Sequence, residues 1–479
     1  MFRGTKIVAT IGPASSDFDM LVRMIRAGVD VVRLNFSHGT ARDHINRAES
    51  VRRAAAECGR EVAIMADMQG PKIRVGKFED GKVLLEAGAR FILDAKWGDN
   101  GEVGNQERVG LDYRALPHDV RPGDKLLLND GLIELTVDKI VGHEIYTTVK
   151  VGGVLSNNKG INRRGGGLTA PALTEKDMRD IVTAAELQAD FLGISFPRSG
   201  DDIRWARDLM RKAGGNSLIV AKIERAEAIT ALEEILDASD AIMVARGDLA
   251  VEVGDAVIPA LQKRMIRLAR EKNKAVITAT QMMESMISSP IPTRAEVSDV
   301  ANAVLDGTDA VMLSAETAAG EYPVETVAAM ARVCVEAEKE DPFLVERRRE
   351  TPPSDVEEAI ARATVFTANS LNIKAVAAMT QSGKTVLLMS RFATTVPIYA
   401  MSSQAETRRK VTLFKGVYPV KFKGARDPEK ALQLAEDELL KRGAVKDGDY
   451  MVLTIGEPYG KAGGTNTMKI VKVGEHRTA

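Results

Sequence analysis

Cysteine is nearly absent from this 479-residue chain, which contains only Cys58 and Cys334 and no C-x-x-C pair. This scarcity excludes a disulfide scaffold and a structural zinc knuckle, and it suits a reducing compartment. Aromatic residues make up 4% of the chain, too few for a platform that stacks single-stranded bases. Lysine and arginine number 66 against 67 aspartate and glutamate residues, so no overall basic field favours nucleic acid.

Long apolar runs are missing as well. No stretch approaches the ~18 residues of a membrane-spanning helix, and the N-terminus enters a strand-like run at Lys6 without the apolar core of a signal peptide. We therefore expect a cytoplasmic protein that binds neither membrane nor nucleic acid. The chain is too long for one hydrophobic core, so about two to four domains are expected.

What is present is a repeated unit of a short apolar run followed by an amphipathic helix. Several of these helices have a recognisable start, at Ser15 or Ser16, at Thr174 with Asp177, and at Thr293 with Glu296. Eight alternating units predict a parallel sheet closed by right-handed crossovers, which is a (β/α)8 TIM barrel. The expected strands are 6–10, 31–34, 62–66, 191–195, 218–221, 241–245, 275–279 and 310–313.

The third unit is interrupted between its strand and its helix. Residues from about 72 to 167 contain Gly-rich turns between short alternating runs such as 125–128, 132–137 and 145–149, which predict an inserted small β-barrel domain. An insertion at this strand end lies on the catalytic face of a barrel, where it can act as a lid. The expected domains are therefore 1–70 and 168–345 for the barrel, 71–167 for the lid and 346–479 for a C-terminal domain.

The C-terminal domain follows a charged, Pro-containing linker at 346–353. A helix is expected near Ser354, with strands near 375–378, 397–400, 417–420 and 450–455, which predicts an open α/β domain. The loop from Thr380 to Thr385 has the hydroxyls and glycine of a phosphate nest, but Ala378 stands where a P-loop requires glycine. On the local sequence, a plain strand-to-helix turn with Lys384 exposed is equally consistent.

Two expected barrel strands end on charged clusters, Lys222-Ile223-Glu224 and Arg246-Gly247-Asp248. Carboxylates delivered by neighbouring strands favour Mg²⁺ or Mn²⁺, and Mg²⁺ takes one or two carboxylates together with substrate oxygens. Either cluster alone would be read as an ordinary strand end. Because both occur in consecutive units, we predict a divalent-cation site for a phosphorylated anion, with Arg246 in a supporting role.

Other strand ends add donors for such an anion. Arg33 and Arg74 have planar guanidinium groups suited to phosphate, although a lone arginine more often forms a surface ion pair. His38 could act as a base, but a loop histidine more often makes a hydrogen bond. The methionines between Met282 and Met286 are predicted to pack in the core.

At this point the residues resemble the pyruvate kinase family over essentially the whole chain. The resemblance is carried by the runs VRLNFSHG (32–39), AKIE (221–224), MVARGDL (243–249), ATQMMESM (279–286) and PTRAE (292–296). It implies transfer of the phosphoryl group of phosphoenolpyruvate to ADP, giving ATP and pyruvate in glycolysis, and it suggests a homotetramer.

The resemblance also implies roles for individual residues. Glu224 and Asp248 would be Mg²⁺ ligands, and Lys222 would face the transferring phosphoryl group. The carboxylate of the substrate would meet Gly247, Asp248 and Thr280, and proton delivery would use hydroxyls near Thr280 and Ser314. Phosphate would be contacted by Arg33 and Arg74, and the nucleotide side would comprise Thr10, Pro13, Asn35, His38, Arg74 and Lys159.

The chain departs from the familiar family pattern where a monovalent cation is held. The matching region here is Asn35, Ser37, Asp67 and Met68, and Lys72 stands where many members have glutamate. A methionine side chain offers no hard oxygen, and the Glu-to-Lys change shifts the local charge by two units. We therefore expect that the enzyme does not require K⁺.

Regulation by a phosphorylated sugar or nucleotide is expected in the C-terminal domain. The expected contacts are Thr380, Ser382, Gly383, Lys384, Thr385 and Lys461. Two rival functions are a metal-dependent aldolase or lyase on a similar barrel, and a non-catalytic phosphometabolite sensor that uses the Ser382 to Thr385 loop. Neither rival predicts ATP formation from phosphoenolpyruvate and ADP, and intact Lys222, Glu224 and Asp248 argue against a sensor.

Overall fold

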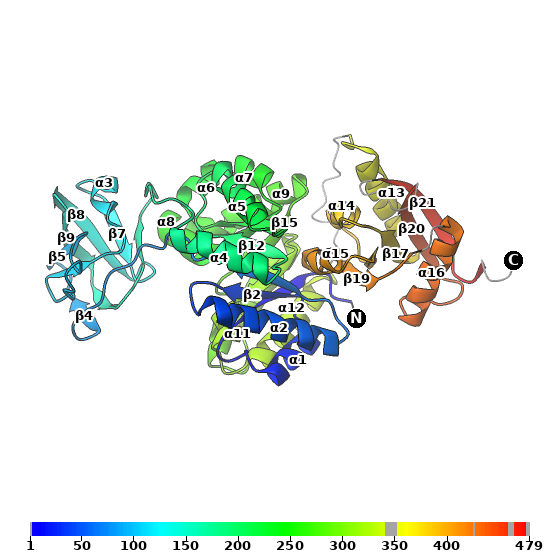
Figure 1. Ribbon diagram of the computed structural model, residues 1–479, viewed down its shortest axis with the longest axis horizontal. Coiled ribbons are helices and arrows are strands. Elements are labelled where there is room, and N and C mark those ends of the chain that lie inside the picture. The colour runs from blue at the N-terminus through cyan, green and yellow to red at the C-terminus, as the bar shows by residue number, and fades with distance from the viewer. Residues whose placement is uncertain (1, 341–351, 425–426, 458–463, 476–479) are drawn as a thin grey trace.

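The structure is a computed structural model that describes residues 2–340, 352–424, 427–457 and 464–475. Three bodies follow one another along its longest axis, with the barrel in the middle, the inserted β domain at one end and the C-terminal α/β domain at the other (Figure 1). Most of the linker expected at 346–353, and Lys461, lie outside the described residues.

The barrel is a closed parallel sheet with strand order β1-β16-β15-β14-β13-β12-β3-β2. This confirms the predicted (β/α)8 architecture, and each strand lies within two residues of its expected bounds. The strands are β1 (Lys6–Ile11), β2 (Val31–Asn35), β3 (Ala63–Asp67), β12 (Phe191–Ile194), β13 (Leu218–Ile223), β14 (Ala241–Ala245), β15 (Ala275–Ala279) and β16 (Ala310–Leu313).

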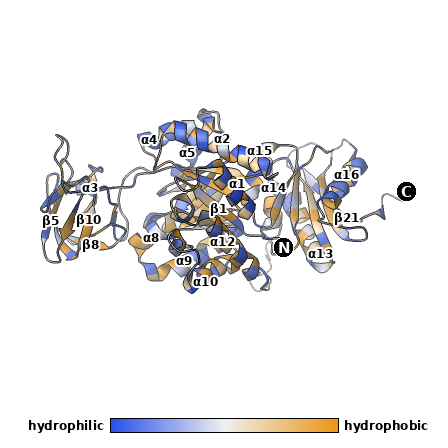
Figure 2. Ribbon diagram, turned by 90° about the horizontal axis from the view of Figure 1, so that it is seen from below, coloured by the Kyte–Doolittle hydropathy of each residue, from blue (hydrophilic) through white to orange (hydrophobic). Residues whose placement is uncertain are grey.

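Helices cover the outside of this sheet and mix polar with apolar residues along their length (Figure 2). They are α1 (Phe18–Ala27), α2 (Ala41–Glu57), α4 (Glu175–Glu186), α5 (Gly200–Lys212), α6 (Ala226–Thr230), α7 (Leu232–Ala238), α8 (Arg246–Val253), α9 (Ile258–Glu271), α10 (Arg294–Leu305), α11 (Ala315–Ala318) and α12 (Pro323–Ala337), with short 3-10 turns η1 (Asp255–Val257) and η2 (Glu284–Ile287). None of the helices in the described part of the chain is long and apolar enough to cross a membrane.

Helix starts were predicted with mixed success. Thr174 and Thr293 form the expected capping boxes at α4 and α10. The expectation of Ser15 or Ser16 at the start of α1 is wrong, because Asp17 is the N-cap and accepts from the backbone N–H of Met20. The two serine hydroxyls instead bond to Gly12 and close the turn after β1.

The inserted domain connects β3 to α4 and has one six-stranded sheet, of order β11-β7-β8-β9-β5-β6, and one β10-β4 pair. Its elements are β4 (Lys82–Leu85), β5 (Arg90–Asp94), β6 (Arg108–Gly110), α3 (Leu116–Asp119), β7 (Lys125–Leu128), β8 (Ile133–Val141), β9 (Glu144–Val151), β10 (Gly153–Ser156) and β11 (Ile161–Arg163). Apolar side chains from both sheets fill its own core.

The C-terminal sheet has the order β19-β18-β17-β20-β21. Its elements are α13 (Val356–Ser370), β17 (Ile373–Met379), α14 (Lys384–Ser390), β18 (Ile398–Ser402), α15 (Ala405–Lys410), η4 (Val411–Leu413), β19 (Val417–Lys421), α16 (Pro428–Lys441), β20 (Tyr450–Gly456) and β21 (Thr465–Lys472). Four strands agree with the expectation. The fifth, β21, pairs antiparallel with β20 and was not predicted, because its exposed face interrupts the apolar run.

Aspartates precede four of the barrel strands and organise its amino-terminal end. Each carboxylate accepts the backbone N–H of a residue on the preceding strand of the barrel, at 2.7 to 2.9 Å, and the four pairs are Asp30 with Ile7, Asp190 with Ile64, Asp240 with Ile219, and Asp309 with Val276. Two of these aspartates also bind arginines of the C-terminal domain, since Asp190 pairs with Arg409 and Asp309 with Arg391. This face therefore docks the C-terminal domain and leaves the opposite face, where the strands end, beneath the lid.

Candidate active site

The carboxyl ends of β3, β12 and β13 bring four polar side chains together. The ammonium of Lys222 lies 3.0 Å from Glu224 Oε1 and 3.2 Å from Asp67 Oδ1, and it donates to Ser195 Oγ at 2.6 Å. All four residues are buried, with Lys222 the most exposed at 8%. The sheet register therefore places charges of both signs in one desolvated cluster that apolar runs alone could not reveal.

Arg33, from β2, extends this cluster across the barrel. It donates to Asp67 Oδ2 at 2.6 Å and to Thr10 Oγ1 at 3.0 Å. Burial alone would raise the pKa of Asp67, but the charges of Lys222 and Arg33 outweigh it and hold this pKa below its usual value. Asp67 thus stays ionised and joins two cations that the sequence places 189 residues apart.

Electrostatics at Glu224 favour a further cation. Burial raises the pKa of Glu224, and the carboxylates of Asp248 and Asp67 raise it further, against the opposing charge of Lys222. For Lys222 itself, Asp67 and Glu224 outweigh burial and raise the pKa, so the lysine is charged. The carboxylates near Glu224 are therefore only partly compensated by Lys222.

Glu224 and Asp248 by themselves do not form a complete cage for a divalent cation. In the described part of the chain, no three His, Cys, Asp or Glu side chains gather closely enough to hold a metal. A cation here would need oxygens from substrate or water, which is how Mg²⁺ is commonly bound next to phosphates. The ammonium of Lys72 lies 3.1 Å from Asp248 Oδ1, so this carboxylate already faces a positive charge.

The loops after β14 and β15 are held to each other. Gly247 donates its backbone N–H to Thr280 Oγ1 at 2.9 Å, and Arg246 donates to the Thr280 carbonyl at 2.7 Å while pairing with Asp299. Thr280 has φ of +68°, a strained conformation for a β-branched residue. Strain of this kind is retained where the surroundings impose it, commonly at functional sites. The supporting role expected of Arg246 agrees with these contacts.

Several other predicted residues lie at the ends of barrel strands or in the turns that follow them. Ser314 follows β16, is half-buried and donates its backbone N–H to the carboxylate of Glu316. Asn35 ends β2, and Ser37 and His38 lie in the turn after it, where His38 is exposed. Met282, Met283 and Met286 are buried in the barrel core, as expected. Pro13 is exposed in the turn after β1.

Arg74 and Lys159 belong to the lid. The Arg74 guanidinium donates to the Asn158 carbonyl at 3.0 Å, within the same domain. Among the described residues, no hydrogen bond joins the side chain of Arg74 or Lys159 to the barrel. Neither of these two predicted nucleotide contacts is therefore hydrogen-bonded to the cluster at Lys222 in the described structure.

The predicted effector loop is stabilised by its own contacts. Gly383 has φ of +85° and donates its N–H to Thr380 Oγ1 at 2.9 Å. Lys384 is exposed, and its ammonium lies 3.0 Å from both Asp355 Oδ2 and Glu357 Oε2. The hydroxyl of Thr385 also bonds to Glu357. The lysine is thus neutralised by the start of α13, which sequence reasoning did not anticipate.

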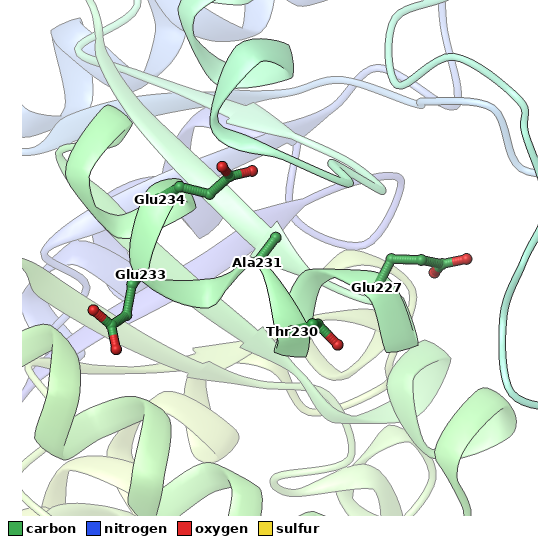
Figure 3. A pocket seen from close by; sticks show the side chains of 5 residues that line it. All are labelled: Glu227, Thr230, Ala231, Glu233 and Glu234. Atoms are coloured by element: carbon green, nitrogen blue, oxygen red, sulfur yellow. The ribbon is translucent and has the colours of Figure 1, made fainter.

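Sequence reasoning also missed Ser195 and Phe196 at the end of β12. Phe196 has φ of +55° and donates its N–H to Glu224 Oε2 at 2.8 Å. The only signal was a serine at the end of an apolar run. An open cavity of about 620 Å³ lies elsewhere, lined by Glu227, Thr230, Ala231, Glu233 and Glu234 of α6 and α7 (Figure 3). None of the predicted site residues lines it.

Comparison with known proteins gives a consistent result. The family description "Pyruvate kinase, barrel domain" matches residues 2–327, and "Pyruvate kinase, alpha/beta domain" matches residues 358–471. Pyruvate kinase II of Salmonella typhimurium is 54% identical over 98% of this chain and 99% of its own length. Pyruvate kinase of Haemophilus influenzae is 53% identical over 95% of this chain and 96% of its own, and that of Geobacillus stearothermophilus is 42% identical over 98% and 80%.

Proposed function

Because the chain belongs to the pyruvate kinase family, we propose that the cluster around Lys222 carries out this family's reaction, phosphoryl transfer from phosphoenolpyruvate to ADP. The observation that carries the proposal is the buried, charged Lys222 held between Asp67 and Glu224 at 3.0 to 3.2 Å. An aldolase, a lyase or a phosphometabolite sensor would not account for family matches to both the barrel and the C-terminal domain.

Lys222 would supply positive charge where negative charge develops. In phosphoryl transfer the protein mostly positions the reactants and neutralises charge. A fixed ammonium in a buried site does this at little cost in reorganisation, and it is worth more there than in water. Arg33, aimed by Asp67 and Thr10, would orient the phosphate. Lys222 would then act on both the transferring phosphoryl group and the oxygen that it leaves.

Glu224 and Asp248 would hold Mg²⁺ or Mn²⁺. The bound cation supplies further positive charge against the substrate oxygens. The N–H groups of Gly247 and Asp248 at the start of α8, together with Thr280, would hold the substrate carboxylate. Proton delivery to the enolate carbon would use hydroxyls and water near Thr280 and Ser314.

Nucleotide binding would use both the barrel and the lid. Thr10 and Asn35 lie at the ends of β1 and β2, and Pro13 and His38 lie on the turns that follow, whereas Arg74 and Lys159 lie in the lid. Because the side chains of Arg74 and Lys159 make no hydrogen bond to the barrel in the described structure, ADP would be enclosed by a movement of the inserted domain. Such closure commonly excludes water and completes a catalytic site.

Independence from K⁺ is the finer part of the proposal. The Met68 side chain is 1% exposed and packs in the barrel core, and the Met68 carbonyl already accepts from Ser195 Oγ at 2.7 Å. The Lys72 ammonium lies 3.1 Å from Asp248 Oδ1, and its fixed positive charge would act on the region of Asn35, Ser37, Asp67 and Met68. A monovalent cation placed there would be repelled by the Lys72 charge, and it would find the Met68 carbonyl already occupied by a hydrogen bond.

Regulation, assembly and location complete the proposal. A phosphorylated sugar or nucleotide would bind Thr380, Ser382, Gly383, Lys384, Thr385 and Lys461. Its phosphate would replace the two carboxylates that now pair with the Lys384 ammonium. The enzyme would be a cytoplasmic homotetramer. An effector acts allosterically only if it distinguishes two global states of the protein.

The direct test is a lactate dehydrogenase-coupled assay with phosphoenolpyruvate, ADP and Mg²⁺. Pyruvate and ATP should form in equal amounts, and Glu224→Ala and Asp248→Ala should each require more Mg²⁺ for half-maximal activity. Asp237→Ala, which alters an exposed carboxylate of α7 that pairs with Lys272, is the control for general damage. No pyruvate from the wild type would disprove the reaction, and unchanged Mg²⁺ curves in both variants would disprove the ligands.

A second test addresses the effector loop. Sugar phosphates and nucleoside monophosphates are added to wild type and to Lys384→Gln, and phosphoenolpyruvate saturation and thermal midpoint are recorded. At least one phosphate should shift both quantities in the wild type and neither in the variant. If none of them shifts either quantity in the wild type, the loop is structural.

A further inference from the structure

Strand β12 supplies none of the predicted site residues, yet it lies between two strands that do. Its neighbours in the barrel are β3, which carries Asp67, and β13, which carries Lys222. An ion pair between these two side chains must therefore cross β12. What β12 presents to the barrel interior decides whether the pair can form.

At the crossing point β12 has no side chain. Gly193 is the register partner of Asp67, and a Cβ atom at this position would lie 2.9 Å from Asp67 Oδ1. That separation is shorter than real Cβ contacts allow, so a side chain here would displace the carboxylate. The gap at Gly193 thus lets Asp67 reach Lys222 Nζ at 3.2 Å.

Two residues further along the same face, β12 ends in a hydroxyl that receives the lysine. Ser195 is 1% exposed, and its Oγ lies 2.6 Å from Lys222 Nζ and 2.7 Å from the Met68 carbonyl. A carbonyl can only accept, so the serine proton points to Met68 and an oxygen lone pair faces the ammonium. The orientation of the hydroxyl is therefore set by the backbone of β3.

The next residue fixes the other partner of the lysine. The backbone N–H of Phe196 donates to Glu224 Oε2 at 2.8 Å, and φ of +55° at this bulky residue is a strained conformation. The end of β12 thus contacts the lysine through a side chain and the carboxylate through the backbone. On the side of β12, the two contacts use a hydroxyl and a backbone N–H, neither of which carries a charge.

We propose that Ser195 is a positioning residue that aims the Lys222 ammonium, and that Gly193 is required because only an absent side chain lets Asp67 share in this positioning. The inference rests on the role given to Lys222 in the proposed function. Without the hydroxyl, the two carboxylates would draw the ammonium toward themselves. The lysine would keep its charge but lose its alignment with the transferring group.

The test compares Ser195→Ala with a matched serine variant. Ser217 is also buried, and its Oγ donates to the Ala189 carbonyl at 2.6 Å, so it links β12 and β13 at the opposite end of the barrel. We expect Ser195→Ala to lower kcat about tenfold or more, with KM for phosphoenolpyruvate changed less than about threefold. Ser217→Ala should lower the thermal midpoint by a similar amount and leave kcat unchanged.

Gly193→Ala is the second variant and should show the same split, a lower kcat with little change in KM. A kcat within about twofold of wild type in Ser195→Ala, or a raised KM at unchanged kcat, would overturn the positioning role. Wild-type kcat in Gly193→Ala would overturn the role of the gap. Lys222→Met distinguishes failure of the proposed function from failure of the positioning role. If Lys222→Met keeps the wild-type kcat, the proposed function of Lys222 is wrong. If Lys222→Met loses activity and Ser195→Ala keeps its kcat, only the positioning role of Ser195 is wrong.

Discussion

Lys72 offers the most decisive test of how charge is arranged in this site, because one substitution reverses its sign. Its ammonium lies 3.1 Å from Asp248 Oδ1 and 4.0 Å from Asp130 Oδ1. At 3.1 Å and an effective dielectric constant of ~20, the attraction to Asp248 is at most about 5 kcal/mol. Both side chains are about a quarter exposed, so solvent reduces this value toward the ~1 kcal/mol typical of exposed pairs.

Replacing Lys72 with glutamate changes this attraction into repulsion. The total change spans both signs and therefore exceeds the ~1.4 kcal/mol that corresponds to a tenfold effect. A monovalent cation would then relieve the excess negative charge near Asp248. We expect Lys72→Glu to be activated tenfold or more by K⁺, and the wild type to be activated less than about twofold.

The assay measures kcat and KM in Tris or tetramethylammonium buffers at matched ionic strength, with and without KCl. Lys72→Met is the control, because it removes the positive charge without adding a negative one, and its activation by K⁺ should be intermediate. Tenfold activation of the wild type by KCl would refute the reasoning. So would a Lys72→Glu variant that is active and indifferent to K⁺.

Three further predictions concern Lys222, Arg391 and Glu252. Lys222→Met should lower kcat by about 10²–10³-fold with little change in KM, because the charge acts mainly in the transition state; a raised KM at constant kcat would contradict this. Arg391→Met removes the ion pair of the buried Asp309 and leaves its carboxylate with hydrogen bonds from backbone N–H groups. The free energy of unfolding of the first transition in urea should therefore fall by about 3–5 kcal/mol. A decrease below about 1 kcal/mol would be evidence against the docking role. Burial raises the pKa of Glu252 from 4.5 to about 7, so the folded protein keeps a proton that the unfolded chain releases, and stability falls as pH rises between these values. Glu252→Gln should therefore raise the thermal midpoint at pH 8 and not at pH 5, and equal shifts at both values would disprove the cause.

Local pattern was sufficient for much of the fold. Buried parallel strands are continuous apolar runs, so the bounds of β14, β15 and β16 were predicted to the residue. Thr174 and Thr293 indicated their helix starts because each has the acidic residue of a capping box three positions later. Pattern failed where three nearby candidates competed for one helix start, as with Ser15, Ser16 and Asp17, because the choice depends on which hydroxyls the preceding turn already uses.

The candidate site also has a part that the sequence indicated and a part that it did not. The charged clusters at Glu224 and Asp248 could be recognised from the chain, since catalytic groups of a barrel gather where its strands end. The partners of those groups could not, because Ser195 reaches Lys222, and Lys72 reaches Asp248, only through sheet register and the placement of the inserted domain. Sequence periodicity tells which residues face inward, but contacts between distant strands arise when the barrel closes. Residue types therefore indicated the chemistry, and closure of the barrel decided which of these side chains lie together.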